Sequence, residues 1–231
     1  MVSLAGSKGV MAMKEYQKIE TPFFRDMDGS KKLILGQFRN PIVEYLKNCQ
    51  WICTEKVDGT NIRVHWDGHS FSFYGRTDVA TIPHFLLDKL EEIFKKPEME
   101  QLMEQMFADR EVMLVGEGYG ERIQKCGSNY IQSGVDFIGF DVMVKAKELD
   151  KWTYLDRRDA EDVYNALGIK MVPIVATMTL NDAVCTVMSK PYSLISETKQ
   201  VMEGLVCVPD VPVYDKCGHR IIVKIKVKDF E

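Results

Sequence analysis

Apolar and polar residues alternate along several short segments of the chain, a pattern typical of β-strands with one buried face. The first such segment begins at Trp51, and strands are predicted over residues 51–56, 61–66 and 71–76. Asp58-Gly59 separates the first two strands and Asp67-Gly68 separates the next two, and Asp-Gly pairs favour tight hairpin turns. We therefore expect an antiparallel meander here, with Lys56 at the mouth of its first hairpin.

A helical period replaces this alternation in the next part of the chain. The apolar residues that recur at helical spacing are Phe85, Leu86, Leu90, Ile93 and Phe94. Pro97 suits the first turn of a second helix, where its missing N–H would have no partner. The residues expected on the buried face of that helix are Leu102, Met103, Met106 and Phe107. We interpret these methionines as core residues.

The rest of the chain mixes strands and helices. Strands are predicted over residues 112–117, 137–144, 204–208 and 220–227, and short helices over residues 42–47 and 181–188. A longer helix over residues 157–167 starts near Asp156 and ends at Gly168, which suits a left-handed helix C-terminus. With no internal repeat or linker, we expect one α+β domain over residues 14–231 after a disordered leader at residues 1–13.

Composition narrows the class of protein. The 231 residues are 45% hydrophobic and 28% charged, as in soluble globular proteins. No apolar run approaches the roughly 20 residues that span a bilayer, and the start lacks the architecture of a secretory signal. A net charge of −4 does not favour nucleic-acid binding, because such domains are usually basic. A locally basic cleft is nevertheless compatible with this charge.

The cysteines argue against a structural zinc site. The six cysteines form no C-x-x-C pair, and the four histidines are scattered among them. Reduced thiols in a cytoplasmic protein are the simplest interpretation.

The last predicted strand carries a row of basic residues on one face. Ile221, Val223 and Ile225 share one parity and belong in the core, so Lys224 and Lys226 project together from the other face. Their spacing is roughly 7 Å, because a strand rises about 3.4 Å per residue. Taken alone, such a row is usually the solvated face of an edge strand.

Six segments give this row a context. They are TEKVDGTN at residues 54–61, FSFYGRT at 71–77, LVGEGYG at 114–120, DFIGFDV at 136–142, MEGLVC at 202–207 and IVKIKVK at 222–228. In this order they resemble the collinear motifs of the covalent nucleotidyltransferase superfamily, which holds ATP-dependent DNA ligases, RNA ligases and mRNA capping enzymes. The details are most similar to the T4-type second family of RNA ligases, which also has a triplet like Ile123-Gln124-Lys125. That family has histidine at the position of Asp58, and this departure leaves the choice between RNA and DNA open.

The resemblance implies that Lys56 attacks the α-phosphorus of ATP and forms a covalent lysine-AMP intermediate. The attacking amine must be unprotonated, although the reference pKa of lysine is about 10.4. Nearby cations penalise its charged form, and Lys224 and Lys226 are suitable neighbours. The same cations would neutralise phosphate charge as pyrophosphate leaves. A surface lysine beside a turn is the alternative.

The resemblance also assigns the residues that would hold the nucleotide and metal. Glu203 matches the family's ligand of Mg²⁺ or Mn²⁺, and magnesium needs only one carboxylate besides phosphate oxygens and waters. Glu117 matches the acid that accepts hydrogen bonds from the ribose hydroxyls. Phe140 matches the aromatic that stacks on adenine. Asp141 lies on the opposite side of the predicted strand by parity, so it receives no nucleotide role.

Other motif positions imply contacts to the base and the phosphates. Glu55 would read the exocyclic amine of adenine, provided that the strand twists or breaks beside Lys56. Asn61 and Arg76 match positions that contact the phosphate or the nick end, where guanidinium offers a planar fork. Arg63 and Lys125 are candidates for a phosphate-tracking surface, and ordinary surface charges are the alternative for each.

From the resemblance we expect a nucleotidyltransferase fold with two antiparallel sheets around an ATP cleft and helices outside. We expect an ATP-dependent RNA ligase that acts as a monomer on nucleic-acid ends or nicked duplexes. With five residues after Lys226, we expect no appended C-terminal domain such as an OB-fold in this sequence, which is then either a naturally minimal enzyme or the catalytic core of a longer one. A DNA-nick ligase, a GTP-using capping-type transferase and an inert end-binding module are the alternatives.

Overall fold

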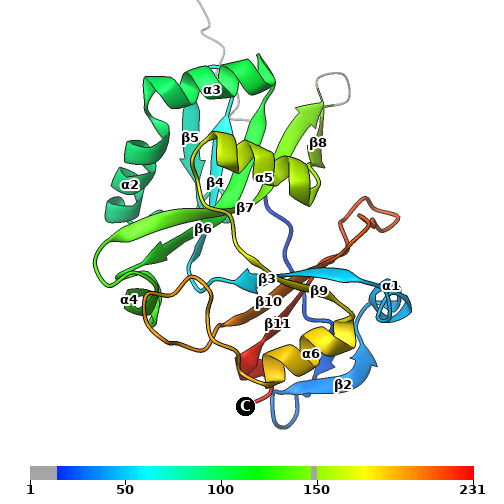
Figure 1. The fold of residues 1–231 in the computed structure, drawn as a ribbon. Coiled ribbons are helices and arrows are strands. Elements are labelled where there is room, and N and C mark those ends of the chain that lie inside the picture. Colours follow the sequence, from blue (N-terminus) through cyan, green and yellow to red (C-terminus); the bar gives the residue numbers. More distant parts are fainter. Residues whose placement is uncertain (1–14, 147–149) are drawn as a thin grey trace, which may run out of the picture.

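The computed structural model describes residues 15–146 and 150–231. The predicted leader at residues 1–13 lies outside these ranges. Within them, two antiparallel sheets form two layers, with helices on the outside (Figure 1). We call the two main sheets the β6 sheet and the β3 sheet after their central strands. The mixed α+β composition predicted from the pattern is confirmed.

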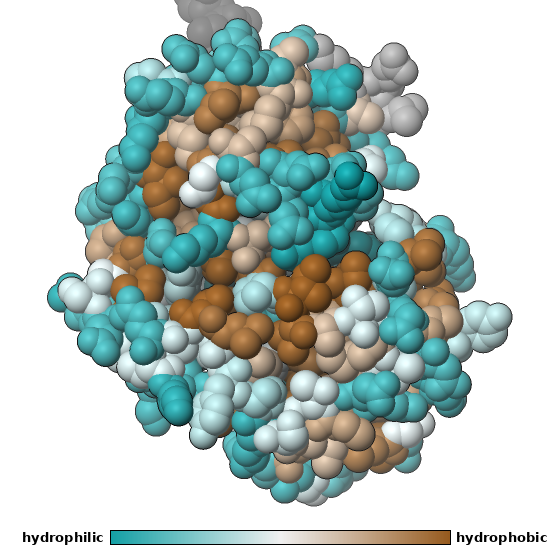
Figure 2. Space-filling model, in the orientation of Figure 1, coloured by the Kyte–Doolittle hydropathy of each residue, from teal (hydrophilic) through white to brown (hydrophobic). Residues whose placement is uncertain are grey.

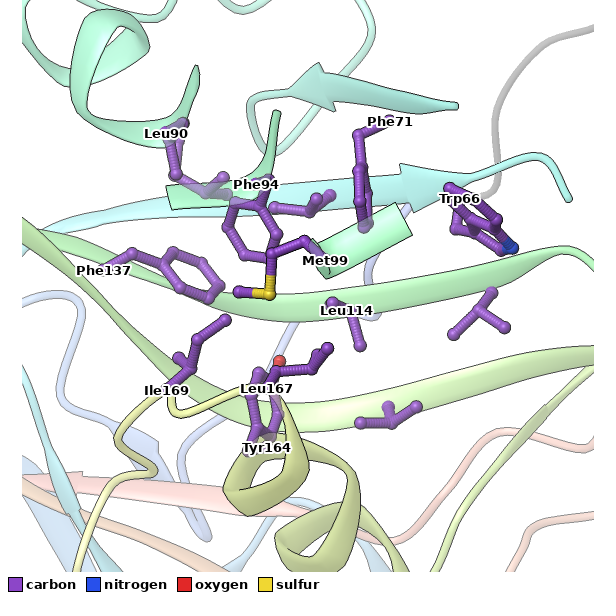
Figure 3. Packing of buried hydrophobic residues seen from close by; sticks show 14 of the residues in the cluster. Trp66, Phe71, Leu90, Phe94, Met99, Leu114, Phe137, Tyr164, Leu167 and Ile169 are labelled. Atoms are coloured by element: carbon purple, nitrogen blue, oxygen red, sulfur yellow. The ribbon is translucent and has the colours of Figure 1, made fainter. Parts of the chain in front are cut away.

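The β6 sheet has the strand order β5-β4-β6-β7-β8, and every neighbouring pair is antiparallel. Its strands are β4 (Thr60–Trp66), β5 (Phe71–Tyr74), β6 (Val112–Gly120), β7 (Val135–Ala146) and β8 (Lys151–Tyr154). The helices that pack on it are α2 (His84–Phe94), α3 (Pro97–Phe107) and α5 (Arg157–Ala166). Side chains of alternate strand positions, such as Ile62 and Val64, meet these helices in one apolar cluster (Figure 3). Rings of Trp66, Phe71, Phe94, Phe137 and Tyr164 belong to it.

The β3 sheet has the order β11-β10-β3-β9, again antiparallel throughout. Its strands are β3 (Trp51–Lys56), β9 (Ile174–Met178), β10 (Gly204–Pro209) and β11 (Val223–Lys226), with a 3₁₀ turn at Val227–Asp229. The elements that pack on it are α1 (Pro41–Tyr45), α6 (Leu180–Met188) and the paired strands β1 (Phe23–Arg25) and β2 (Leu33–Phe38). These elements bury a second apolar cluster that contains Trp51 and Leu205.

The predicted meander is wrong at its first turn and right at its second. β4 and β5 form the expected hairpin, and Gly68 adopts a φ of +101° that suits a tight turn. β3, however, pairs with β10 and β9, so the chain crosses from one sheet to the other after Lys56. The reason is burial, because Trp51 and Cys53 are fully buried in the cluster of the β3 sheet.

Several elements were not predicted. They are β1, β2, β8, β9 and the short helix α4 (Gly127–Tyr130). β9 gives a weak signal because its burial does not alternate, and Ile174 at its start is exposed. The last strand begins at Val223 instead of residue 220, because Arg220 pairs with Tyr214 in a separate bridge. The helix ending at Gly168 is confirmed, with a φ of +67° at that glycine.

Hydrophobic side chains gather in a band between α5 and α6 on the face shown in Figure 2, where the two layers meet. Exposed apolar residues of the described chain include Ile174 and Leu194. In the part of the chain that the structure describes, no helix is both long and apolar enough to span a bilayer.

Candidate active site

A cleft of about 710 Å³ lies between the two sheets. The predicted site residues that line it are Glu55, Lys56, Asn61, Arg76, Glu117, Phe140 and Lys224. They come from β3, the β4–β5 hairpin, β6, β7 and β11, so residues distant in the sequence converge here. Glu203 joins this set by accepting from Lys56, and Lys226 joins it by donating to Glu203.

Glu203 binds two lysines at once. Its Oε2 atom lies 2.6 Å from Lys56 Nζ, and its Oε1 atom lies 2.5 Å from Lys226 Nζ. Sheet register explains the meeting, because Gly204 next to Glu203 pairs with Lys56 on one side and Lys226 on the other. The three side chains are 14–20% exposed, so the cluster is largely withdrawn from water.

The two lysines fix the charge of Glu203. Burial alone would raise its pKa, but the charges and hydrogen bonds of Lys56 and Lys226 outweigh this and lower the pKa below its ordinary value. Glu203 is therefore an anion in the ligand-free protein. It is the kind of hard oxygen donor that magnesium and manganese prefer.

Lys224 faces the cleft, as predicted, two residues before Lys226 on the same strand. Burial lowers its pKa, and the nearby charges of Lys226 and Lys56 lower it further. No ion pair of its side chain is found within residues 15–146 and 150–231. This cation is therefore available to an anionic ligand.

Glu117 is a carboxyl group without a hydrogen bond to the described protein atoms around it. Burial raises its pKa to about 8, despite the opposing charge of Lys56. A half-buried carboxyl that lines the cleft in this way is placed to accept hydrogen bonds from a ligand.

Asn61 presents a second unsatisfied group. Its Oδ1 atom is buried and has no hydrogen-bond partner among the described residues, although Asn61 lines the cleft. Buried polar atoms are normally paired, so an atom of this kind suits a ligand contact. Arg76 lines the same cleft from an exposed position.

Phe140 occupies a β-bulge. On β6, Val115 pairs with Asp141 and Gly116 pairs with Gly139, so Phe140 is the extra residue of β7. Both Phe140 and Asp141 therefore line the cleft, and the predicted placement of Asp141 on the opposite side is wrong. Strict alternation cannot reveal an inserted residue.

A tyrosine from α5 supports the bulge. Tyr164 donates hydrogen bonds to the carbonyl oxygens of Val115 at 2.9 Å and Asp141 at 3.1 Å. Gly139 is required beside it, because a Cβ there would lie 2.2 Å from the Tyr164 ring. The backbone around Phe140 is thus fixed from α5.

Glu55 faces away from Lys56 on β3, as strand parity requires, although it still borders the cleft. Ser193 Oγ donates to its Oε1 atom at 2.5 Å, and the Leu194 N–H donates to its Oε2 atom at 2.7 Å. Burial raises the pKa of Glu55, and these two hydrogen bonds counteract the shift. Its predicted contact with a base stays a prediction.

Arg63 and Lys125, the two candidates for a phosphate-tracking surface, differ in burial. Arg63 is fully buried, where its Nε donates to the Gly75 carbonyl and its Nη2 pairs with Asp78 at 2.8 Å. A phosphate-tracking role for Arg63 is therefore wrong. Lys125 is exposed next to Gln124, whose Nε2 donates to the Gly59 carbonyl at 2.9 Å.

The side chains that bind the Asp141 carboxylate were not predicted as site residues. Tyr16 donates a hydrogen bond to this carboxylate, and Arg220 donates two, at 2.6 and 2.8 Å. The Arg220 guanidinium also stacks on Tyr154, 4.1 Å from the ring centroid. Arg220 shares the strand parity of Lys224 and Lys226, which is the one signal that could have indicated it, and no motif includes Tyr16.

The cleft fits a divalent cation held with a phosphate ligand. Glu203 supplies one carboxylate, and phosphate oxygens with waters would complete the shell. A separate group of potential ligand atoms, from Asp215, Cys217 and His219, lies in an exposed turn away from these lysines.

A family model described as RNA ligase matches residues 49–226. No curated protein sequence matches the chain. Solved structures of a Naegleria gruberi RNA ligase are similar to it. A mutant with ATP and Mn is 22% identical with a TM-score of 0.59, covering 82% of this chain and 52% of that chain. Another mutant with ATP and Mn is 21% identical with a TM-score of 0.59, covering 94% and 64% respectively.

A third Naegleria gruberi structure, with PPi, is 21% identical with a TM-score of 0.58, covering 94% of this chain and 63% of that chain. The chain thus spans between about half and two thirds of the proteins it matches. The likeness confirms the predicted fold, with two antiparallel sheets around a cleft and helices outside.

Proposed function

This chain belongs to the RNA ligase family, and on that premise we propose that it joins RNA ends at the expense of ATP. The observation that carries the proposal is the cluster of Lys56, Glu203, Lys226 and Lys224 at one cleft. A lysine held among two further lysines and one acid, next to a space that accommodates a nucleotide, suits covalent nucleotidyl transfer.

In the first step, Lys56 Nζ loses a proton to solvent and attacks the α-phosphorus of ATP. A P–N bond forms, the bond to the bridging oxygen of the β-phosphate breaks, and pyrophosphate leaves. Lys224 and Lys226 stabilise the negative charge that develops on the phosphates. Magnesium or manganese, held by Glu203, would supply additional charge neutralisation when bound.

In the later steps, the 5′-phosphate of an RNA end attacks the phosphorus of the lysine-AMP and releases Lys56. A 3′-hydroxyl then attacks the activated 5′-phosphate, which forms the phosphodiester and releases AMP. Arg76, exposed at the cleft, suits the recognition of a terminal phosphate because its planar fork matches phosphate oxygens.

ATP would be held along the cleft between the two sheets. Phe140 would stack on the base, Glu117 would accept from the ribose hydroxyls, and Asn61 would contact the phosphate. The Glu117 carboxyl, which makes no hydrogen bond to the described residues, supports its contact with the ribose. Asn61 would meet the phosphate through its Nδ2 donor, because its Oδ1 atom can only accept.

The decisive experiment is trapping of the covalent adduct. The protein is incubated with α-labelled ATP and magnesium, and then denatured and measured by mass spectrometry. We expect a gain of one AMP in the wild type and none in Lys56→Ala. Label from GTP instead would favour a capping-type reaction, and an adduct that persists in Lys56→Ala would exclude this mechanism.

The finer parts of the proposal concern the substrate and its setting. Nicked duplexes with RNA or DNA on each side of the break would identify the preferred strand. The free cysteines support a reducing compartment such as the cytoplasm. We also propose that the protein acts as a monomer, which size-exclusion chromatography with light scattering tests.

A further inference from the structure

The crossing that follows Lys56, residues 57–59, is held by side chains that the proposed reaction does not use. We infer that Tyr130 is a positioning residue for the Lys56 amine, acting through the backbone of this crossing. The inference rests on the proposed function, because it concerns the rate at which Lys56 becomes adenylated.

Two hydrogen bonds tie the crossing to the segment that contains α4. The Asp58 N–H donates to the Tyr130 hydroxyl oxygen at 3.3 Å, and Gln124 Nε2 donates to the Gly59 carbonyl at 2.9 Å. The crossing is thus held at the N–H of Asp58 and at the carbonyl of the next residue, Gly59. Because neither bond involves a catalytic side chain, their effect on Lys56 is positional.

Close packing limits movement of the crossing on its other side. A Cβ at Gly59 would lie 2.3 Å from the Gly118 carbonyl oxygen and 2.7 Å from Glu117 Cγ. The backbone of Gly59 therefore touches β6 directly, which only glycine permits here. Val57 is buried in an apolar cluster together with Tyr130. The crossing lies between β6 and the two hydrogen-bonding side chains.

The turn before α4 adopts an unusual backbone to present Gln124. Arg122 and Gln124 have positive φ angles of 64° and 57°, and Ile123 between them is buried. Left-handed backbone is unfavourable in residues other than glycine and is concentrated at functional sites. Here the strained turn places the Gln124 amide on the Gly59 carbonyl.

Tyr130 is itself firmly held. It is 2% exposed, and the Glu197 N–H donates to its carbonyl oxygen at 3.3 Å. The same downstream segment contains Ser193 and Leu194, which bind the Glu55 carboxylate. Glu55 lies before Lys56 and Asp58 lies after it. Both are therefore held by segments that contact one another, since the segment that binds Glu55 also binds Tyr130.

This arrangement matters because the attacking amine must lie in line with the leaving group. A misplacement of about 1 Å can lower the rate on the order of 100-fold. Lys56 ends β3, so one flank of its backbone is fixed by sheet pairing and the other by the crossing. Loss of the Tyr130 contact would loosen the second flank alone.

The test compares Tyr130→Phe with Tyr119→Phe in single-turnover adenylation by ATP and magnesium. Tyr119 is buried in the same cluster, 6.0 Å from the Tyr130 ring, and makes no hydrogen bond to the crossing in the described structure. We expect Tyr130→Phe to lower the rate constant at saturating ATP at least tenfold, with an unchanged KM for ATP and melting temperature. Tyr119→Phe should react at the wild-type rate.

Gln124→Leu serves as a second variant, because Gln124 is exposed and its loss should not impair folding. It should also lower the rate constant without changing KM. Hydrogen exchange supplies a readout that does not need activity, and the Asp58 amide should exchange faster in Tyr130→Phe than in Tyr119→Phe.

A wild-type rate in Tyr130→Phe, or an equal loss in both tyrosine variants, would overturn the inference while leaving the proposed function intact. If the wild type forms no adduct at all, the proposed function fails and the inference fails with it.

Discussion

Arg220 places both terminal nitrogens on the carboxylate of Asp141, with Nη1–Oδ1 at 2.8 Å and Nη2–Oδ2 at 2.6 Å. Asp141 belongs to β7, whereas Arg220 precedes β11, so this bidentate pair joins the two sheets at the wall of the cleft. Both side chains are almost buried, at 10% and 13% exposed. The pair fixes the bulge at Phe140 relative to the strand that carries Lys224.

Asp141→Ala should destabilise the protein substantially. Removal of one partner leaves a buried guanidinium without its anion, which typically costs about 3–5 kcal/mol. Urea denaturation at neutral pH measures the loss. The control is Glu231→Ala, which breaks the exposed pair of Lys190 and Glu231 and should cost at most about 1 kcal/mol. Equal losses in the two variants would contradict this account.

Glu203→Gln should destabilise the protein in a pH-dependent way. The pKa of Glu203 is lowered in the folded state, so its contribution to stability is complete above the unfolded value of about 4.5 and is lost as pH falls below it. We expect a loss of about 2 kcal/mol at pH 7, because Lys56 and Lys226 lose their shared anion. The two proteins should converge near pH 3, and a difference independent of pH would refute the ionic origin.

Glu117→Gln should have the opposite pH dependence. The folded-state pKa of Glu117 is raised to about 8, so the folded protein binds a proton that the unfolded chain releases between pH 4.5 and 8. The wild type therefore loses stability over that window, by up to about 1.4 kcal/mol per pH unit. The variant lacks this loss. Thermal melting of both ligand-free proteins at pH 6 and pH 9 should show the variant gaining relative stability at the higher pH.

Phe140→Ala should weaken nucleotide binding more than folding. Stacking of a base on an aromatic ring contributes about 1–3 kcal/mol, which corresponds to roughly tenfold or more in KM for ATP. The adenylation rate as a function of ATP concentration measures this change. Phe140→Tyr retains the ring and should remain close to the wild type. An unchanged KM in Phe140→Ala would remove Phe140 from the base-binding role.

The sequence predicted the strands and helices that have clear periodicity, together with the convergence of Lys56, Glu203, Lys224 and Lys226. Alternation placed Lys224 and Lys226 on one face, and motif order placed Lys56 near them. Tertiary contacts decide which sheet a strand joins. The alternation of apolar and polar residues therefore could not show that β3 and β4 belong to different sheets.

Other parts of the site depended on contacts between distant residues. The bulge at Phe140 adds one residue without altering local composition, so it carried no signal for the placement of Asp141. Arg63 resembled a surface cation, and its burial depends on the Gly75 carbonyl and on Asp78 in the following loop. The predicted contact of Glu55 with a base stays a prediction, and the sequence did not show that Ser193 and Leu194 donate to its oxygens.

The two largest apolar clusters share no residue, since one belongs to the β6 sheet and the other to the β3 sheet. Because the two apolar cores are separate, we expect calorimetry of the ligand-free protein to give a broadened transition. A nucleotide that touches Phe140 on one half and Lys224 on the other would couple them thermodynamically. Saturation with ATP analogues should then sharpen the heat-capacity peak into a single cooperative event.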